Sequence, residues 1–185
     1  MTSMNKKKNI AFNVAFCGIM TAVAVIFMFL SIIPSLAYAV PAFAGIAIWT
    51  VSEHMNRKWA YLCYAAAALL SLVLIPEVEA NLFFIFFFGY YPTLCIIIGK
   101  IKNKVLRFIT KLGIFNIAVV IAFNLTVLLL SAEEALEGME DFGEYAVYIF
   151  WGLGNLAFLI YDYALNVFKD FYIRIIKPKI ASKLR

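Results

Sequence analysis

The first feature that suggests chemistry is a row of polar and aromatic residues along the last apolar run. Six residues recur at spacings of 4, 3, 4, 7 and 4, namely Glu144, Tyr148, Trp151, Asn155, Asp162 and Asn166. These steps keep all six on one face of a helix with 3.6 residues per turn. Asp162 is the acid deepest in an apolar run, and a carboxylate in hydrocarbon costs roughly 2.5–3.5 kcal/mol. We therefore expect Asp162 to face the bundle interior, water or a cation.

Two roles remain open for this row. Asp162 either pairs with a basic residue such as Lys100 or Lys111, or titrates as the proton site of a carrier. Tyr148, Trp151 and Asn155 lie nearer the opposite membrane face. They either bind a small molecule or make interhelical hydrogen bonds and interface anchors.

No catalytic set accompanies these residues. The chain has one histidine, His54, and three cysteines, Cys17, Cys63 and Cys95, which lack the spacing of metal ligands or disulfide partners. The phosphate-binding loop, HExxH and G-x-S-x-G motifs are missing. We therefore expect no enzyme activity, no metal and no cofactor. Active transport would need an ion gradient or a separate ATPase.

The stretch "NLFFIFFFGYYPTLCIIIG", from Asn81 to Gly99, predicts a broken membrane helix. Pro92 cannot donate a backbone hydrogen bond and frees the carbonyl near Phe88. Such a carbonyl is tolerated in a membrane only where protein or water satisfies it, so the hydroxyls of Tyr90 and Tyr91 are candidate partners. The break at Phe88–Pro92 either lines a small outward-facing pocket or serves packing alone.

Further polar residues could line or guard such a pocket. Glu79 and Asn81 precede the broken stretch and would lie at the outer mouth. Asn116 and Asn124 lie two turns apart in the next run, where they either bond neighbouring helices or line a polar cavity. The candidate substrate-binding residues are Glu79, Asn81, Tyr90, Tyr91, Asn124, Tyr148, Trp151 and Asn155.

The elements that position these residues follow from composition. Of 185 residues, 65% are hydrophobic and 15% are charged, which is typical of a membrane protein. Six apolar runs are separated by brief connectors: Ile10–Ile33, Ser35–Val51, Trp59–Ile75, Asn81–Gly99, Phe108–Ser131 and Tyr145–Phe168. The sequence predicts an all-α polytopic protein with six transmembrane helices in one domain, residues 1–185. Its first helix is too long for a cleaved signal peptide.

The charges predict the orientation of this bundle. Of the 16 lysines and arginines, 15 fall in the N-terminus, the second-to-third and fourth-to-fifth connectors, and the C-terminal segment, and Lys111 lies in the first turn of the fifth run on the same side. The other connectors carry acids only, above all the loop Ala132–Glu144. By the positive-inside rule both termini are cytoplasmic. The basic tail, residues 169–185, then lies on anionic headgroups, and nucleic-acid binding is not expected.

The first run carries a stripe of small residues, Ala11, Ala15, Gly18 and Ala22, spaced 4, 3 and 4. Such a stripe allows close helix contact, either inside the protein or with another subunit.

With this stripe, the chain resembles the substrate-binding S components of energy-coupling factor (ECF) vitamin transporters. The likeness covers nearly the whole chain in architecture, includes the Ala-x-x-x-Ala pattern Ala11–Ala15, and extends to "RKWAYLCYAAAALLSLVLIPEVEANLFFIFFFGYYP". The resemblance implies a bacterial cell-membrane subunit that captures a small micronutrient on the outer side. It also implies docking, through the first helix, to a transmembrane coupling subunit with ATPases.

The substrate class and two rival functions complete the expectations. An acidic outer mouth favours a neutral or cationic substrate over an anion. One rival is a small membrane scaffold without a ligand, and the other is a proton-coupled carrier that uses Asp162.

Overall fold

The computed structural model describes residues 2–33, 36–130 and 145–178 of the chain. The acidic loop, including Glu144, and the end of the basic tail lie outside the described residues. The chain divides into two compact units, Met1–Ala135 and Leu136–Arg185. Each unit is described by itself.

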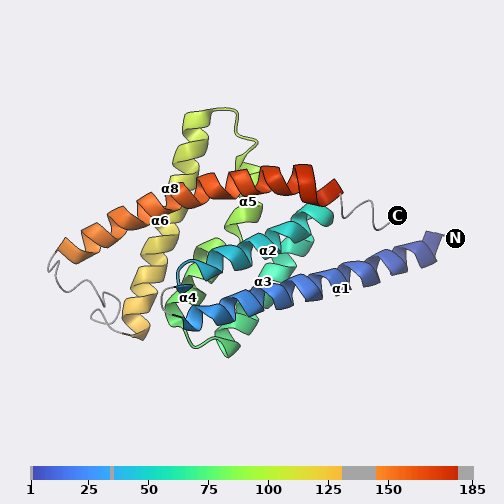
Figure 1. Cartoon of the computed structure of the whole chain (residues 1–185), viewed down its shortest axis with the longest axis horizontal. Helices are drawn as coiled ribbons and strands as arrows, with labels where there is room; N and C mark the ends of the chain where they lie inside the picture. The colour runs from blue at the N-terminus through green and yellow to red at the C-terminus, as the bar shows by residue number, and fades with distance from the viewer. Residues whose placement is uncertain (1, 34–35, 131–144, 179–185) are drawn as a thin grey trace. The chain divides into compact units, whose positions relative to one another are not determined.

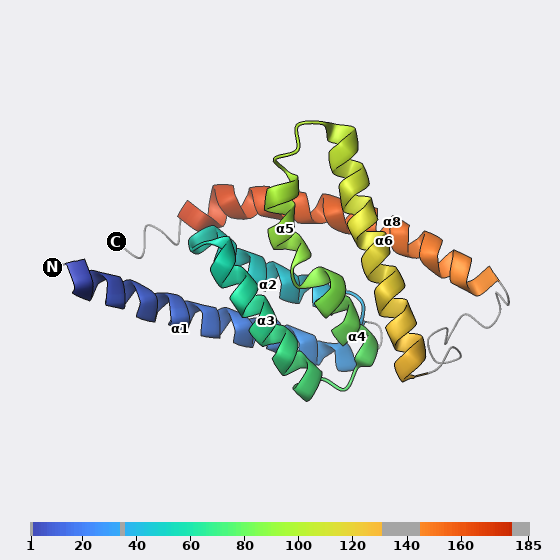
Figure 2. The same cartoon turned by 180° about the vertical axis from the view of Figure 1, so that it is seen from behind.

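The first unit is a helical bundle (Figures 1 and 2). Its elements are α1 (Thr2–Phe29) with a 3₁₀ turn at Leu30–Ile32, α2 (Val40–His54), α3 (Arg57–Leu74), α4 (Val78–Phe83), a π-helical turn at Phe84–Phe88, α5 (Tyr91–Ile98) and α6 (Lys104–Leu129). Both views place the C-terminal ends of α1, α3 and α6 and the N-terminal end of α4 together at one end of the unit. The second unit contains α8 (Ala146–Phe171), which continues into a π-helical turn at Tyr172–Ile176.

Among the described residues, four helical stretches are long and apolar enough to cross a membrane: Ile10–Ile32, Arg57–Leu74, Val78–Ile98 and Lys104–Leu129. They correspond to the expected first, third, fourth and fifth spans, so the all-helical, membrane-compatible class is confirmed. Helix α2 has 15 residues, fewer than the roughly 20 that a span usually needs. Helix α8 is long enough, but Asn155, Asp162 and Asn166 reduce its apolar character.

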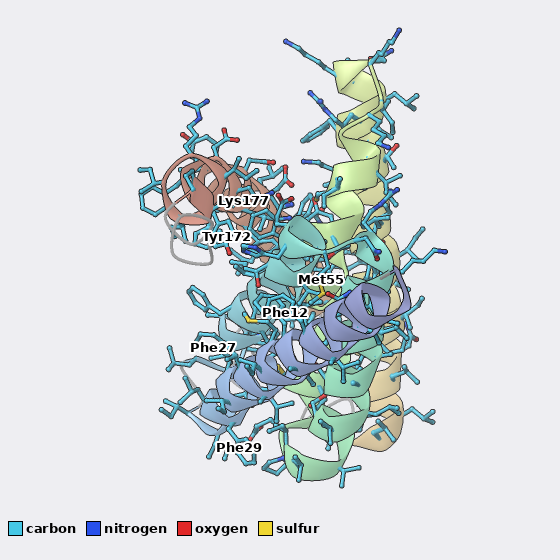
Figure 3. The ribbon with its side chains drawn as sticks, turned by 90° about the vertical axis from the view of Figure 1, so that its right-hand side faces the viewer. Phe12, Phe27, Phe29, Met55, Tyr172 and Lys177 are labelled. Atoms are coloured by element: carbon cyan, nitrogen blue, oxygen red, sulfur yellow. The ribbon has the colours of Figure 1, made fainter. Side chains whose placement is uncertain are left out.

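Small residues fill the contacts among α1, α2 and α3. The buried set includes Ala24, Ala44, Ala47, Ala60, Cys63 and Ala67. Small side chains let helix axes approach closely, and this close packing holds helices together in lipid, where hydrophobic association between them is weak. Large side chains such as Phe12 and Phe29 instead lie exposed on α1 (Figure 3).

The broken span is the most enclosed of the four. In its best window 56% of the residues are buried, compared with 28–33% in the other three. Phe84, Phe87 and Tyr91 are almost completely buried there. Helices α2, α3 and α6 pack against this span, which accounts for its greater burial.

Several boundaries differ from the sequence-based prediction. Helix α2 runs on to His54, beyond the predicted end at Val51, and the His54 ring meets that of Phe16 edge-on at a centroid distance of 5.6 Å. At the other end of the chain, helical structure continues past Lys169 to Ile176. The start of the predicted tail, residues 169–185, is thus an extension of α8.

Candidate functional site

The predicted helix break is confirmed, but it is longer than expected. Helix α4 ends at Phe83, the chain then forms a π-helical turn at Phe84–Phe88, and α5 begins at Tyr91 with Pro92 in its first turn. Proline suits the first turn of a helix because its missing N–H would have no intrahelical partner there. The distortion therefore extends upstream of the proline, and π turns of this kind often occur at functional sites.

Two tyrosine hydroxyls satisfy carbonyls of the π turn. Tyr64 on α3 donates to the Ile85 oxygen at 2.5 Å, and Tyr90 donates to the Phe86 oxygen at 2.6 Å. Tyr90 thus bonds a carbonyl of the break, but that of Phe86 and not the one predicted near Phe88. Sequence reasoning missed Tyr64, because nothing along the chain links it to a turn twenty residues later.

Tyr91 packs against the aromatic residues of the break. Its ring is fully buried and lies against Phe87, with ring centroids 4.4 Å apart. Phe87 in turn meets Phe115 of α6 edge-on at 5.2 Å. Aromatic packing on this side of the turn therefore ties α5 to α6.

Glycines let two neighbouring helices approach the break. A Cβ on Gly45 of α2 would lie 2.0 Å from the Phe88 oxygen, and a Cβ on Gly89 would lie 2.6 Å from the Tyr64 ring. No real side chain fits at such distances. Helices α2 and α3 therefore hold the break by direct contact with its backbone.

A pocket of about 460 Å³ lies beside the break. Its walls come from α3, the π turn, α5 and α6: Tyr64, Ile85, Phe86, Tyr90, Leu94, Ile114, Ile117, Ala118 and Ile121. The rings of Tyr64 and Tyr90 meet edge-on at 5.8 Å. None of these lining residues is charged. We call this cavity the tyrosine pocket.

The residues expected at the outer mouth do not line the tyrosine pocket. Glu79 accepts a hydrogen bond of 2.5 Å from Tyr38, which lies in the connection before α2. The Asn81 amide donates to the Ile75 oxygen at 2.9 Å and closes the turn between α3 and α4. Asn81 is 4% exposed, and its Oδ1 has no hydrogen-bond partner among the described residues. These side chains fix the start of α4.

The asparagines of the long helices share one arrangement. Each side-chain amide donates to the carbonyl four residues earlier: Asn116 to Leu112, Asn124 to Val120, Asn155 to Trp151 and Asn166 to Asp162. Asn124 is exposed and lies outside the pocket lining. The Asn124 amide therefore donates its hydrogen bond within its own helix.

The remaining predicted residues belong to the second unit. Tyr148 and Trp151 are exposed on α8, where Asn155 bonds back to the Trp151 carbonyl. Asp162 lies near Asn166, whose amide reaches a carboxylate oxygen at 3.4 Å. Of the eight candidate substrate-binding residues, the structure places Tyr90 in the tyrosine pocket. The pairing of Asp162 with a lysine stays a prediction.

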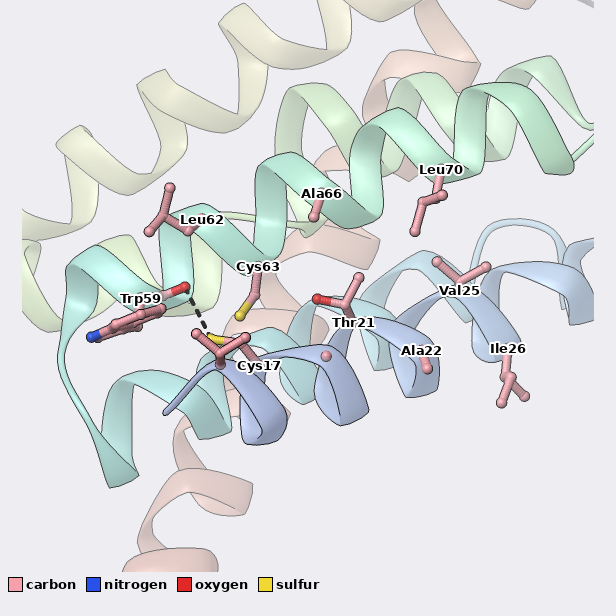
Figure 4. A pocket seen from close by; sticks show the side chains of 12 residues that line it. Cys17, Thr21, Ala22, Val25, Ile26, Trp59, Leu62, Cys63, Ala66 and Leu70 are labelled. Atoms are coloured by element: carbon pink, nitrogen blue, oxygen red, sulfur yellow. Dashed lines mark hydrogen bonds between the residues drawn. The ribbon is translucent and has the colours of Figure 1, made fainter. Parts of the chain in front are cut away.

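The small-residue stripe lies on the outside of α1. Ala11, Ala15, Gly18 and Ala22 are all exposed, and a Cβ on Gly18 would meet no atom within 4 Å. Gly18 and Ala22 border a groove of about 540 Å³ between α1 and α3 (Figure 4). The docking role of the stripe stays a prediction.

Two cysteines lie at the floor of this groove. The Cys17 thiol reaches the Trp59 oxygen at 3.8 Å, and Figure 4 shows Cys63 of α3 beside it. The described residues contain no group of three or more histidine, cysteine or acidic side chains placed to hold a metal ion.

No protein-family model, curated protein or solved structure matches the chain.

Proposed function

We propose that this protein is the membrane-embedded capture subunit of an ECF-type importer for a small micronutrient. The tyrosine pocket carries the proposal. A helix broken inside the membrane, with its carbonyls bonded by tyrosines and a cavity at its side, is an arrangement that small transporters use to hold substrates. A scaffold without a ligand needs no such cavity.

The exposed stripe on α1 supports a separate docking surface. Small side chains and the open space at Gly18 leave room for a helix of the coupling subunit. The stripe lies on α1, whereas the tyrosine pocket is lined by α3, the π turn, α5 and α6. Capture of substrate and attachment to the ATPase module would then involve different residues.

The proposal includes six spans in a bacterial cell membrane with both termini in the cytoplasm. Helices α2 and α8 complete the set, and a bundle lets α2 be short because its neighbours shield its ends. The distribution of all basic residues supports this orientation.

Co-purification tests the proposal. Tagged wild-type protein, Ala15→Trp and Val120→Trp would be expressed in a bacterium that has a shared ATPase–coupling module. Val120 is exposed on α6 and lines neither pocket, so it controls for the bulk of the added indole. We expect the module with wild type and Val120→Trp, and its loss with Ala15→Trp.

The alternatives predict other outcomes. Absence of the module with every protein contradicts the proposal and leaves a scaffold or a proton-coupled carrier. Transport that needs no ATPase and disappears in Asp162→Asn would favour the carrier.

A further inference from the structure

The walls of the tyrosine pocket bear on the charge of its ligand. Its nine lining residues are aliphatic or aromatic, and none carries a charge. Moving an ion from water into such apolar walls carries a large desolvation penalty. A cation over the tyrosine rings would recover only part of this penalty through cation–π attraction. The pocket therefore favours a neutral ligand over either kind of ion.

The two tyrosine hydroxyls of the pocket determine which hydrogen bonds a ligand can make there. A backbone carbonyl can only accept, so Tyr64 and Tyr90 must both donate their protons to the Ile85 and Phe86 oxygens. Each phenol oxygen can still accept a hydrogen bond through a lone pair. A ligand that bonds to these oxygens must donate an N–H or O–H group.

The other lining residues determine which ligand shape fits the pocket. Ile85, Leu94 and Ile114 contribute flat aliphatic surface, and Phe86 contributes a ring. A volume of about 460 Å³ is within the range of small-molecule sites and suits a ligand of one or two fused rings. Ring compounds also bind with little loss of conformational freedom.

We infer that the tyrosine pocket binds an uncharged, mainly apolar ring compound that donates an N–H or O–H hydrogen bond to Tyr64 or Tyr90. This inference rests on the proposed function and names its substrate class. It narrows the expectation of a neutral or cationic substrate to a neutral one.

Matched probes test the inference on the full-length protein in lipid nanodiscs. Indole carries one N–H donor, and benzofuran has nearly the same shape without it. Tryptamine and indole-3-acetate add a positive and a negative charge. Equilibrium dialysis against empty nanodiscs corrects for partition into lipid. We expect saturable binding of indole, about fivefold tighter than that of benzofuran for one net hydrogen bond, and weaker binding of both ions.

Variants locate the site. Tyr64→Phe and Tyr90→Phe keep the rings but remove an acceptor oxygen, so at least one should abolish the preference for indole over benzofuran. Ile117→Trp, at an exposed position that lines the pocket, should block all probes. Tyr163→Phe, at a highly exposed tyrosine of α8, should leave binding unchanged.

Three results would overturn the inference: equal binding of indole and benzofuran, tighter binding of either ion, or no saturable binding of indole. Wild-type co-purification with the ATPase module under the same conditions would show that only the ligand class had failed. Loss of the module as well would remove the proposed function.

Discussion

Gly45 of α2 lies directly against the carbonyl oxygen of Phe88, so closely that a methyl group on Gly45 would be 2.0 Å from it. This is the carbonyl to which Pro92, four residues later, cannot donate a backbone hydrogen bond. The same methyl group would lie 3.5 Å from the Pro92 ring. The absence of a side chain on one helix thus permits the break in another.

Gly45→Ala should destabilise the protein by about 1–3 kcal/mol, because the clash is with backbone and the backbone must shift to relieve it. Unfolding in mild detergent, followed by circular dichroism during titration with a denaturing detergent, measures the change. Gly113→Ala is the control, because a Cβ there meets nothing within 4 Å. Equal stability of the two variants would mean that α2 does not press on the break.

Asn103 caps the start of α6 and offers a second test. Its Oδ1 accepts from the Val105 and Leu106 amides at 2.9 and 3.3 Å. Asn103→Ala should cost about 1 kcal/mol in the free energy of unfolding, whereas Asn103→Asp keeps an acceptor and should cost little. The same detergent titration applies. A loss as large in Asn103→Asp as in Asn103→Ala would contradict a capping role.

The hydrogen bond between Tyr38 and Glu79 joins the connection before α2 to the start of α4. Burial raises the pKa of Tyr38, and the hydrogen bond to Glu79 raises it further. A raised pKa in the folded protein contributes stability that is complete below the unfolded value of about 10 and is lost as pH rises through the folded value.

The stability difference between wild type and Tyr38→Phe should therefore be constant through neutral pH and shrink at strongly alkaline pH. Glu79→Gln removes the negative charge and should bring the pKa of Tyr38 closer to its ordinary value. Ultraviolet titration of the phenolate, taken as the difference from Tyr38→Phe, measures this shift. An unchanged titration in Glu79→Gln would remove Glu79 as a cause.

The three cysteines should differ in their reaction with a membrane-permeant maleimide. Cys17 is partly exposed, whereas Cys63, which lines the same groove, and Cys95 are 2% and 8% exposed. Cys17 should therefore be labelled first, as measured by mass spectrometry of peptides at successive times. Cys17→Ser should remove the fast phase, and faster labelling of Cys63 would mean that α1 and α3 separate.

The asparagines show where sequence reasoning reached its limit. The spacing of Asn116 and Asn124 places them on one side of a helix, which indicates either a helix contact or a cavity. The structure shows that each amide bonds to the preceding turn of its own helix. Periodicity gives the direction of a side chain, but it does not predict a hydrogen bond to the backbone of the same helix.

The sequence by itself determined the apolar helices, the break at Pro92 and the small-residue stripe of α1. These features depend on local physics: a span needs a run of apolar residues, proline lacks an N–H, and small side chains recur at helical spacing. The tertiary structure decided that Tyr64 bonds to the π turn, that Gly45 faces the Phe88 carbonyl and that Glu79 bonds to Tyr38. Each of these contacts joins residues 21 to 43 positions apart, and only the packing of helices brings such pairs together.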